Sequence, residues 1–413
     1  MRSSKSSKLA VAGEGGKVTS RRATIALATR RGIAKSSRAR ALSAAMLLIA
    51  GGAFAATAAR ADGSQPFGPK FIVSCTIPDN GDLNPYGIAF VPKDFPLGGT
   101  IAPGDVLVAN FNAKSNLQGT GVTIIQFTPS AGIVTPLVSV GQNGTATTFF
   151  TSNRKGLTTA LGILRKGFVI VGNLPSASGG GSLQVINGNG KLVNTFTDPK
   201  FSGPWDLTIN DEGATAQLFV SNVVDGTVVR LNLSVSDTNV AILSKNVIAQ
   251  GYAHRPDPTA FVLGPTGLAF DQKANVLYVA STLNNAIYAI TAARTRTSPP
   301  PADSKGDLVY RDKAHLRGPL ALVFAPNGDL ITANGDAVNG DPTYPSELVE
   351  FTKGGKFVGQ SNIDAAQGGA FGIAVSASWF PFSFAAVDDV PNTVTVFTAP
   401  GVGSSSIPVA TGQ

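Results

Sequence analysis

The sequence is poor in the residues that most often form cross-links or carry out chemistry. Its 413 residues include one cysteine, Cys75, and two histidines. A single cysteine excludes an intramolecular disulfide and a paired-thiol redox centre, and no phosphate-binding loop, zinc-ligand spacing or Ser-His-Asp order is present. Cys75 lies in the alternating run 71–77 and is predicted to be a buried small hydrophobic residue. Charged residues make up 14% of the chain, below the roughly 25% usual for soluble domains, which suits buried strands joined by neutral turns.

A short pattern built only from strands is repeated along the chain. It consists of a glycine-containing turn, a strand resembling Gly-Ile-Ala-Phe, a second apolar strand ending in Asn, Ser or Asp, and a third alternating strand. It is clearest at residues 264–270, 276–281 and 285–290. Repetition at a period of roughly 40 to 60 residues indicates small sheets that bury their faces against their neighbours, as in a β-propeller.

Six copies of this pattern can be placed. Their first strands begin at Gly87, Gly162, Asp206, Gly267, Ala321 and Gly372. Their second strands end at Asn110, Asn173, Asn222, Ser281, Asn334 and Asp388. We therefore predict an all-β fold over residues 62–413, a six-bladed β-propeller of four-stranded antiparallel sheets.

The ring can be closed in more than one way. Residues 71–77 resemble a fourth strand and precede the first copy, so we predict that they complete the last blade and cover a sheet edge. The rival closure uses residues 405–411. The wide spacing between the first two copies also leaves room for a seventh, partial blade around residues 134–150.

The basic charge of the chain is concentrated in residues 1–61. This segment holds 12 Lys or Arg against Glu14 alone, and removing them from the totals of 33 basic and 25 acidic residues leaves 21 and 24. The remaining chain is slightly acidic, which argues against a nucleic-acid partner.

Residues 1–61 have the form of a bacterial export signal, disordered or helical. An apolar run at 41–59 follows the basic region, and Ala59-Arg60-Ala61 has the small-x-small form of a cleavage site, predicting Asp62 as the mature N-terminus. Residues 29–35 resemble a twin-arginine motif; the alternative is an ordinary Sec leader. The sequence thus predicts a periplasmic or secreted protein with no membrane span in its mature part.

The repeat also resembles a known group. Residues 264–271 with 277–281, and residues 320–324 with 327–334, are similar to NHL-repeat and gluconolactonase-like six-bladed propellers, and the resemblance covers roughly residues 70–400. Members of that group include Ca²⁺-dependent lactonases, lyases and binding scaffolds, so the resemblance implies the fold without choosing an activity. The metal-ligating Glu of the gluconolactonase-like enzymes has no convincing counterpart here.

The topology of a blade predicts where a site lies. A first strand starts on the face where the second strand ends, so Tyr86, Trp205 and Asp206 should meet the strand-end polar residues at one mouth of the central channel. Such a ring of oxygens suits Ca²⁺. The candidate metal ligands are Asp206 and Asp388 with amides from Asn173, Asn222 and Asn334. The alternative is that these side chains satisfy backbone groups of turns.

The two histidines suggest a second cluster. His254 and His315 fall in successive connectors between blades, predicted on the same mouth, where they could act as general acid and base. Arg255 and Arg317 could hold an anionic group beside them, and Tyr86 and Trp205 are further candidate ligand-binding residues. The alternative is a pair of exposed loop histidines.

These features predict an exported monomeric propeller that binds a small molecule or a protein through its channel mouth. The alternative is a Ca²⁺-assisted hydrolase of the lactonase or esterase type, or a lyase, with its site at the same mouth.

Overall fold

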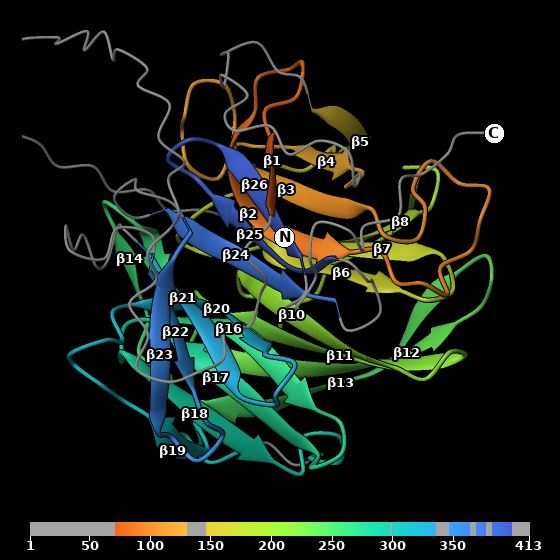
Figure 1. Cartoon of the computed structure of the whole chain (residues 1–413). Coiled ribbons are helices and arrows are strands. Elements are labelled where there is room, and N and C mark those ends of the chain that lie inside the picture. The colour runs from red at the N-terminus through yellow and green to blue at the C-terminus, as the bar shows by residue number, and fades with distance from the viewer. Residues whose placement is uncertain are drawn as a thin grey trace, which may run out of the picture. The chain divides into compact units, whose positions relative to one another are not determined.

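The computed structural model describes residues 71–129, 146–297, 300–335, 347–363, 369–376 and 382–398. Within them the chain forms strands and no helix (Figure 1). None of these described residues therefore belongs to a helix that could cross a membrane. The predicted leader, residues 1–61, and the rival closing segment, residues 405–411, lie outside this part of the chain.

Six antiparallel sheets of four strands follow one another along the chain, and we number them blades 1 to 6. Blade 1 contains β2 (Leu83–Phe90), β3 (Val106–Asn112), β4 (Thr123–Phe127) and β5 (Thr147–Thr151). Blade 2 contains β6 (Leu157–Leu164), β7 (Phe168–Asn173), β8 (Ser182–Asn187) and β9 (Leu192–Phe196). Blade 3 contains β10 (Pro204–Asp211), β11 (Thr215–Asn222), β12 (Thr227–Val235) and β13 (Val240–Gln250).

The second half of the ring repeats this arrangement. Blade 4 contains β16 (Pro265–Asp271), β17 (Val276–Ser281), β18 (Ala286–Thr291) and β19 (Asp307–Tyr310). Blade 5 contains β20 (Pro319–Phe324), β21 (Leu330–Asn334), β22 (Glu347–Phe351) and β23 (Phe357–Asn362). Blade 6 contains β24 (Ala370–Val375), β25 (Phe382–Asp388), β26 (Thr393–Thr398) and β1 (Phe71–Cys75). A separate hairpin, β14 (Arg255–Asp257) with β15 (Phe261–Leu263), lies between blades 3 and 4 in the sequence.

The predicted six-bladed propeller is thus confirmed, and so is its closure. β1 pairs antiparallel with β26 along its whole length, from Phe71 opposite Phe397 to Cys75 opposite Thr393. The N-terminal strand therefore completes the last blade and covers the edge of β26. Cys75 is buried as expected, with 5% of its surface exposed. The described end of the segment predicted as a seventh blade is instead β5, the fourth strand of blade 1.

The six first strands form the inner wall of the ring. Each contacts the next, from β2 through β6, β10, β16 and β20 to β24, and β24 contacts β2 again. Two glycines permit this close approach, because a Cβ atom on Gly267 would collide with the carbonyl oxygen of Leu320 and one on Gly372 with that of Tyr86. Hydroxyl groups also join neighbouring inner strands, as where Thr158 Oγ1 donates to the carbonyl oxygen of Pro204 at 2.8 Å.

The hydrophobic core lies between successive blades. The second strands are buried on both faces, as in β7, and this explains their continuous apolar sequence. Between blades 2 and 3, for example, Ile170 and Val185 belong to the same cluster as Leu218 and Leu231. Because each sheet is covered by its neighbours, the repeat is stable only as a ring.

Candidate functional site

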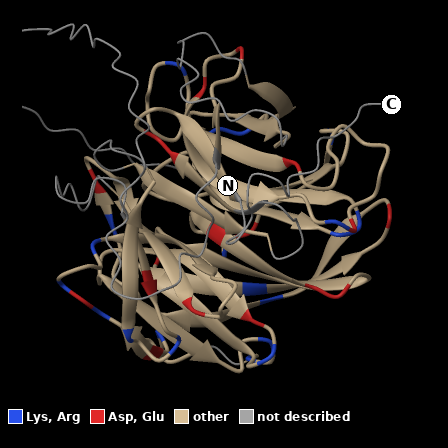
Figure 2. Ribbon diagram, in the orientation of Figure 1, with Lys and Arg blue, Asp and Glu red and all other residues tan. Residues whose placement is uncertain are grey.

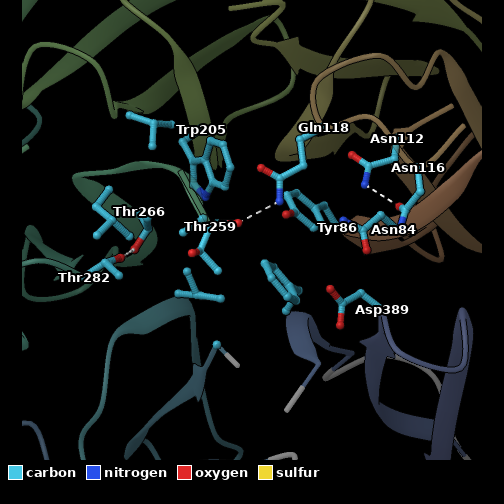
Figure 3. Close-up of a pocket in the computed structure, with 16 residues that line it drawn as sticks. Asn84, Tyr86, Asn112, Asn116, Gln118, Trp205, Thr259, Thr266, Thr282 and Asp389 are labelled. Carbon is cyan, nitrogen blue, oxygen red and sulfur yellow. Dashed lines mark hydrogen bonds between the residues drawn. The ribbon is translucent and has the colours of Figure 1, made fainter. Parts of the chain in front are cut away.

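A cavity of about 220 Å³ lies where the first strands begin, and we call it the mouth pocket (Figure 3). Tyr86, Trp205, Thr266, Leu320 and Phe371 contribute its floor, from five of the six first strands. The loop between β3 and β4 and the β14–β15 hairpin form much of its wall. The predicted channel mouth is therefore a real cavity, and it includes two of the predicted ligand-binding residues.

The aromatic floor residues occupy equivalent positions in their blades. Tyr86, Trp205 and Phe371 each follow the residue that pairs with the end region of the second strand: Pro85 opposite Asn110, Pro204 opposite Asn222, and Ala370 opposite Asp388. In each blade the register shifts immediately afterwards. Because they occupy equivalent positions in the repeat, these three rings lie together at the channel axis.

The rings pack into a plug at that point. Tyr86 is stacked between Phe111 and Phe371, with ring centroids 4.6 and 4.3 Å apart and interplanar angles of 13° and 10°. Trp205 is tilted against Tyr86 at 5.7 Å. All four side chains are buried. Aromatic pairs contribute about 0.5–1.5 kcal/mol beyond the burial of their area, so the floor is a rigid apolar surface.

Two buried polar atoms at the mouth pocket have no hydrogen-bond partner in the part of the chain that the structure describes. They are Trp205 Nε1, a donor, and Asn112 Oδ1, an acceptor. The Asn112 amide nitrogen donates to Asn116 Oδ1 at 2.8 Å, which orients the amide. Both residues line the pocket. A buried polar group without a partner costs about 1–3 kcal/mol, so a polar ligand that reached these two atoms from the pocket would gain by pairing with them.

The β14–β15 hairpin closes one side of the pocket. Gln118 Nε2 donates to the carbonyl oxygen of Thr259 at 3.0 Å, joining the β3–β4 loop of blade 1 to the hairpin (Figure 3). The ring of Phe261 meets that of Phe111 edge-on at 5.4 Å. Phe261 has a φ of 64°, which is uncommon for a bulky residue and is found where surrounding contacts impose it.

The mouth pocket carries little charge. Asp389 is the single charged side chain among its described lining residues, beside amides and threonines. Elsewhere in the described chain, Figure 2 shows Lys and Arg interspersed with Asp and Glu, mainly on loops and outer strands. The amides and threonines favour a polar ligand, and an anionic one would meet no counter-charge among the described lining residues.

Each of the predicted amide metal ligands makes a hydrogen bond within its own blade. The amide nitrogens at the second-strand ends donate to backbone carbonyls of the segment that leads into the first strand of the same blade. The pairs are Asn110 with Thr76, Asn173 with Lys155, Asn222 with Lys200, and Asn334 with His315. These side chains thus connect the end of each second strand to the segment that precedes the first strand. This agrees with the alternative that they satisfy backbone groups.

The two predicted aspartates are also separated. Asp388 Oδ1 accepts a hydrogen bond from Val390 N at 3.0 Å, within its turn. Asp206 faces the channel beyond the aromatic plug, where its oxygens accept hydrogen bonds from Leu207 N at 2.8 Å and Leu268 N at 3.0 Å. No group of three or more His, Cys, Asp or Glu suited to a metal occurs among the described residues. No described contact joins the five residues, and a shared Ca²⁺ site stays a prediction.

The predicted histidine pair is not brought together by any described contact. His254 Nδ1 lies 2.9 Å from the carbonyl oxygen of Tyr252. His315 Nδ1 lies 2.6 Å from Asp312 Oδ2, and its ring stacks on Phe357. Burial alone would raise the pKa of Asp312, but hydrogen bonds, first that of His315, lower this pKa to about 2.

The predicted arginines are likewise outside the mouth pocket. Arg255 pairs with Asp257 at 2.8 Å within the hairpin, and the backbone nitrogen of Arg317 donates to Asn334 Oδ1 at 3.0 Å. Neither arginine nor either histidine lines the pocket. Of the candidate residues, the structure therefore joins Tyr86 and Trp205 alone in this cavity.

Several lining residues were missed by the sequence-based reasoning. Phe371 precedes Gly372 as Tyr86 precedes Gly87, so the position of the repeat could have revealed it. Asn112, Asn116 and Gln118 lie at or beyond the end of β3, which extends two residues past the predicted end at Asn110. No repeated signal marks them, because the loops of different blades differ.

No protein-family model matches the chain, and no curated protein matches it. Solved structures with a similar fold include a gluconolactonase from Xanthomonas campestris, with 10% identity over 80% of this chain and 90% of that chain and a TM-score of 0.47. A streptogramin B lyase is 14% identical over 80% of this chain and 98% of that chain, with a TM-score of 0.40. A chain of a nidogen–laminin complex is 12% identical over 70% and 84%, with a TM-score of 0.42. These likenesses concern the fold alone.

Proposed function

We propose that this chain is an exported ligand-binding propeller whose mouth pocket holds a small, uncharged, polar molecule. The observation that carries the proposal is the pair of buried atoms without partners, Trp205 Nε1 and Asn112 Oδ1, at one cavity. A ligand that accepts a hydrogen bond from the indole and donates one to the amide would satisfy both. The free energy that is lost by leaving them unpaired is then recovered on binding.

The apolar floor supplies the remainder of the binding free energy. A flat or ring-shaped ligand can lie against the stacked Tyr86 and Phe371 while its polar groups reach the amides of the wall. A cavity of about 220 Å³ accommodates one small molecule and not a folded partner. Binding of a protein would instead use the loops around the rim.

A screen with a matched pair of variants tests this proposal. Uncharged cyclic compounds bearing hydroxyl, amide or lactam groups are screened by ligand-observed NMR against the full-length chain. Trp205→Phe should weaken a genuine mouth ligand at least about tenfold, because the indole donor is removed while the ring remains. The control is Tyr278→Phe, which removes a polar group from an aromatic side chain that does not line the mouth pocket.

Two outcomes would contradict the proposal. One is a screen in which no uncharged compound binds. The other is an equal loss of affinity in Trp205→Phe and Tyr278→Phe. The hydrolase or lyase alternative stays a prediction, and Asp389 is the one carboxylate among the described lining residues of the mouth pocket that could act as a base.

Export is a separate part of the proposal with its own test. The leader and its cleavage site support it. The chain expressed in a bacterial host should be recovered from the periplasm with an intact mass that begins at Asp62. An uncleaved chain retained in the cytoplasm would overturn this part without affecting the mouth pocket.

A further inference from the structure

A second cavity, of about 320 Å³, lies along the first strands beyond the aromatic plug, and we call it the lower channel. It shares no lining residue with the mouth pocket. All six first strands contribute to its wall, through apolar residues such as Ile88, Leu161, Leu322 and Ile373. The inner strands of the ring therefore form the wall of this cavity.

One charged residue, Asp206, lines this cavity among the described residues. The other polar side chains of the wall are the hydroxyls of Thr159, Thr208 and Ser376. No Lys, Arg or His lines it. The carboxylate of Asp206 is thus without a counter-charge in the lower channel.

The neighbouring strands do not supply the missing positive charge. The first strands carry only two other charged residues, Asp211 at the end of β10 and Asp271 at the end of β16. Each of these already has its own cation, since Asp211 pairs with Arg165 at 3.6 Å and Asp271 with Lys353 at 2.9 Å. β11, which pairs with β10, contains no charged residue.

The hydrogen bonds of Asp206 leave part of its capacity unused. Two backbone N–H groups, those of Leu207 and Leu268, each donate to one carboxylate oxygen. An ionised carboxylate can accept about four hydrogen bonds. Burial raises the pKa of Asp206 from 3.8 to about 7, with the two backbone hydrogen bonds acting in the opposite direction. The ionised form is therefore costly, and an added positive charge would stabilise it.

We propose that the lower channel is a second binding site, for an organic monocation whose primary ammonium group contacts Asp206 and whose apolar body lies against the inner strands. An ammonium group supplies up to three donors to the free acceptor positions of the carboxylate. The alkyl or aryl part removes apolar surface of Ile88, Leu161 and Leu322 from water. A metal ion fits less well, because Ca²⁺ needs six to eight oxygen ligands and Asp206 is the one carboxylate among the described lining residues.

The proposal does not depend on the mouth pocket. The two cavities share no lining residue, so a failure of the uncharged-ligand screen would not count against a cation site in the lower channel.

Titration calorimetry at pH 8 tests the proposal with a defined pair of probes. Hexylammonium chloride and 1-hexanol, which share the same apolar chain, are titrated into the full-length protein. We expect hexylammonium to bind at least about tenfold more tightly than hexanol, because the desolvated ion pair is formed with the cation alone. In Asp206→Asn this preference should disappear. In Asp271→Asn, a matched change at the end of the next inner strand, it should remain.

Three results would overturn the proposal. The first is that the unaltered protein binds hexylammonium no more tightly than hexanol. This measurement does not depend on whether a variant folds. The second is a preference retained in Asp206→Asn, which would place the cation elsewhere. The third is complete displacement of hexylammonium by an equal concentration of CaCl₂, which would indicate a metal site instead.

Discussion

The mouth pocket and the lower channel are both built on the first strands of the blades, yet their linings differ. The mouth pocket has an aromatic floor and a wall of amides, threonines and Asp389, whereas the lower channel is lined by aliphatic side chains, three hydroxyls and Asp206. Trp205 and Asp206, adjacent in the sequence, line different cavities. One residue of displacement along a first strand thus decides which kind of ligand a side chain can meet.

The largest loss of stability should come from removing one ring of the plug that separates the two cavities. Phe371→Ala deletes one ring of the Phe111–Tyr86–Phe371 stack and leaves a hole between the two cavities. We expect the free energy of unfolding to fall by about 3–5 kcal/mol, measured by urea denaturation. Leu308→Ala, at a residue with 52% of its surface exposed, is the control and should change it by less than about 0.5 kcal/mol. Equal effects of the two changes would show that the stack contributes no special stability.

The carboxylate of Asp206 in the lower channel should make the free energy of unfolding of the protein depend on pH. The folded-state pKa of Asp206 is raised from 3.8 to about 7, so the folded protein keeps a proton that the unfolded chain releases. Its contribution is complete below pH 3.8 and is lost as pH rises through about 7, a change of about 4 kcal/mol.

Asp206→Asn isolates this contribution from the other titrating groups. The free energy of unfolding of each protein is measured at pH 4 and at pH 8. The unaltered protein should lose more stability than Asp206→Asn across that range. Parallel pH profiles of the two proteins would contradict the assignment.

A smaller loss is expected where the inner strands approach one another. Gly372→Ala places a Cβ atom against the carbonyl oxygen of Tyr86, at the level of the plug, and should cost about 1–3 kcal/mol because a close-packed wall must shift. Gly359→Ala is the matched control, since nothing lies within 4 Å of its added Cβ. If both glycines tolerate alanine equally, the close approach of β24 to β2 does not limit the packing of the ring.

The smallest effect on stability should come from the hairpin contact at the mouth. Gln118→Ala removes the exposed hydrogen bond to Thr259 and should lower the free energy of unfolding by about 0.5–1.5 kcal/mol. It should weaken a mouth ligand while leaving hexylammonium binding in the lower channel unchanged. An equal effect on both ligands, measured by calorimetry, would mean that the two cavities are coupled.

Much of the fold could be predicted because the propeller repeat is local. β7, β11, β17, β21 and β25 end at the predicted residues, and β1 closes the ring as predicted. The candidate site was less accessible to prediction. The strand-end amides were located correctly, but Asn173, Asn222 and Asn334 turn toward carbonyls of their own lead-in segments and do not converge. The direction in which an Asn side-chain amide points depends on which backbone carbonyl lies unpaired beside it in the folded protein.

The sequence by itself determined the propeller repeat and the order of strands within a blade, because apolar periodicity and turn residues act over a few positions. It left open a rival closing segment and a seventh, partial blade, which the pairing of β1 with β26 and of β5 with β4 decided. Only the tertiary structure decided that Tyr86, Trp205 and Phe371 meet Phe111 in a plug and that Asp206 lies beyond it. These residues are far apart in the chain. The register shifts between Pro204 and Asp206, where Trp205 joins the plug and Asp206 lines the lower channel. Closure of the ring brings them together, since all six inner strands must share one axis.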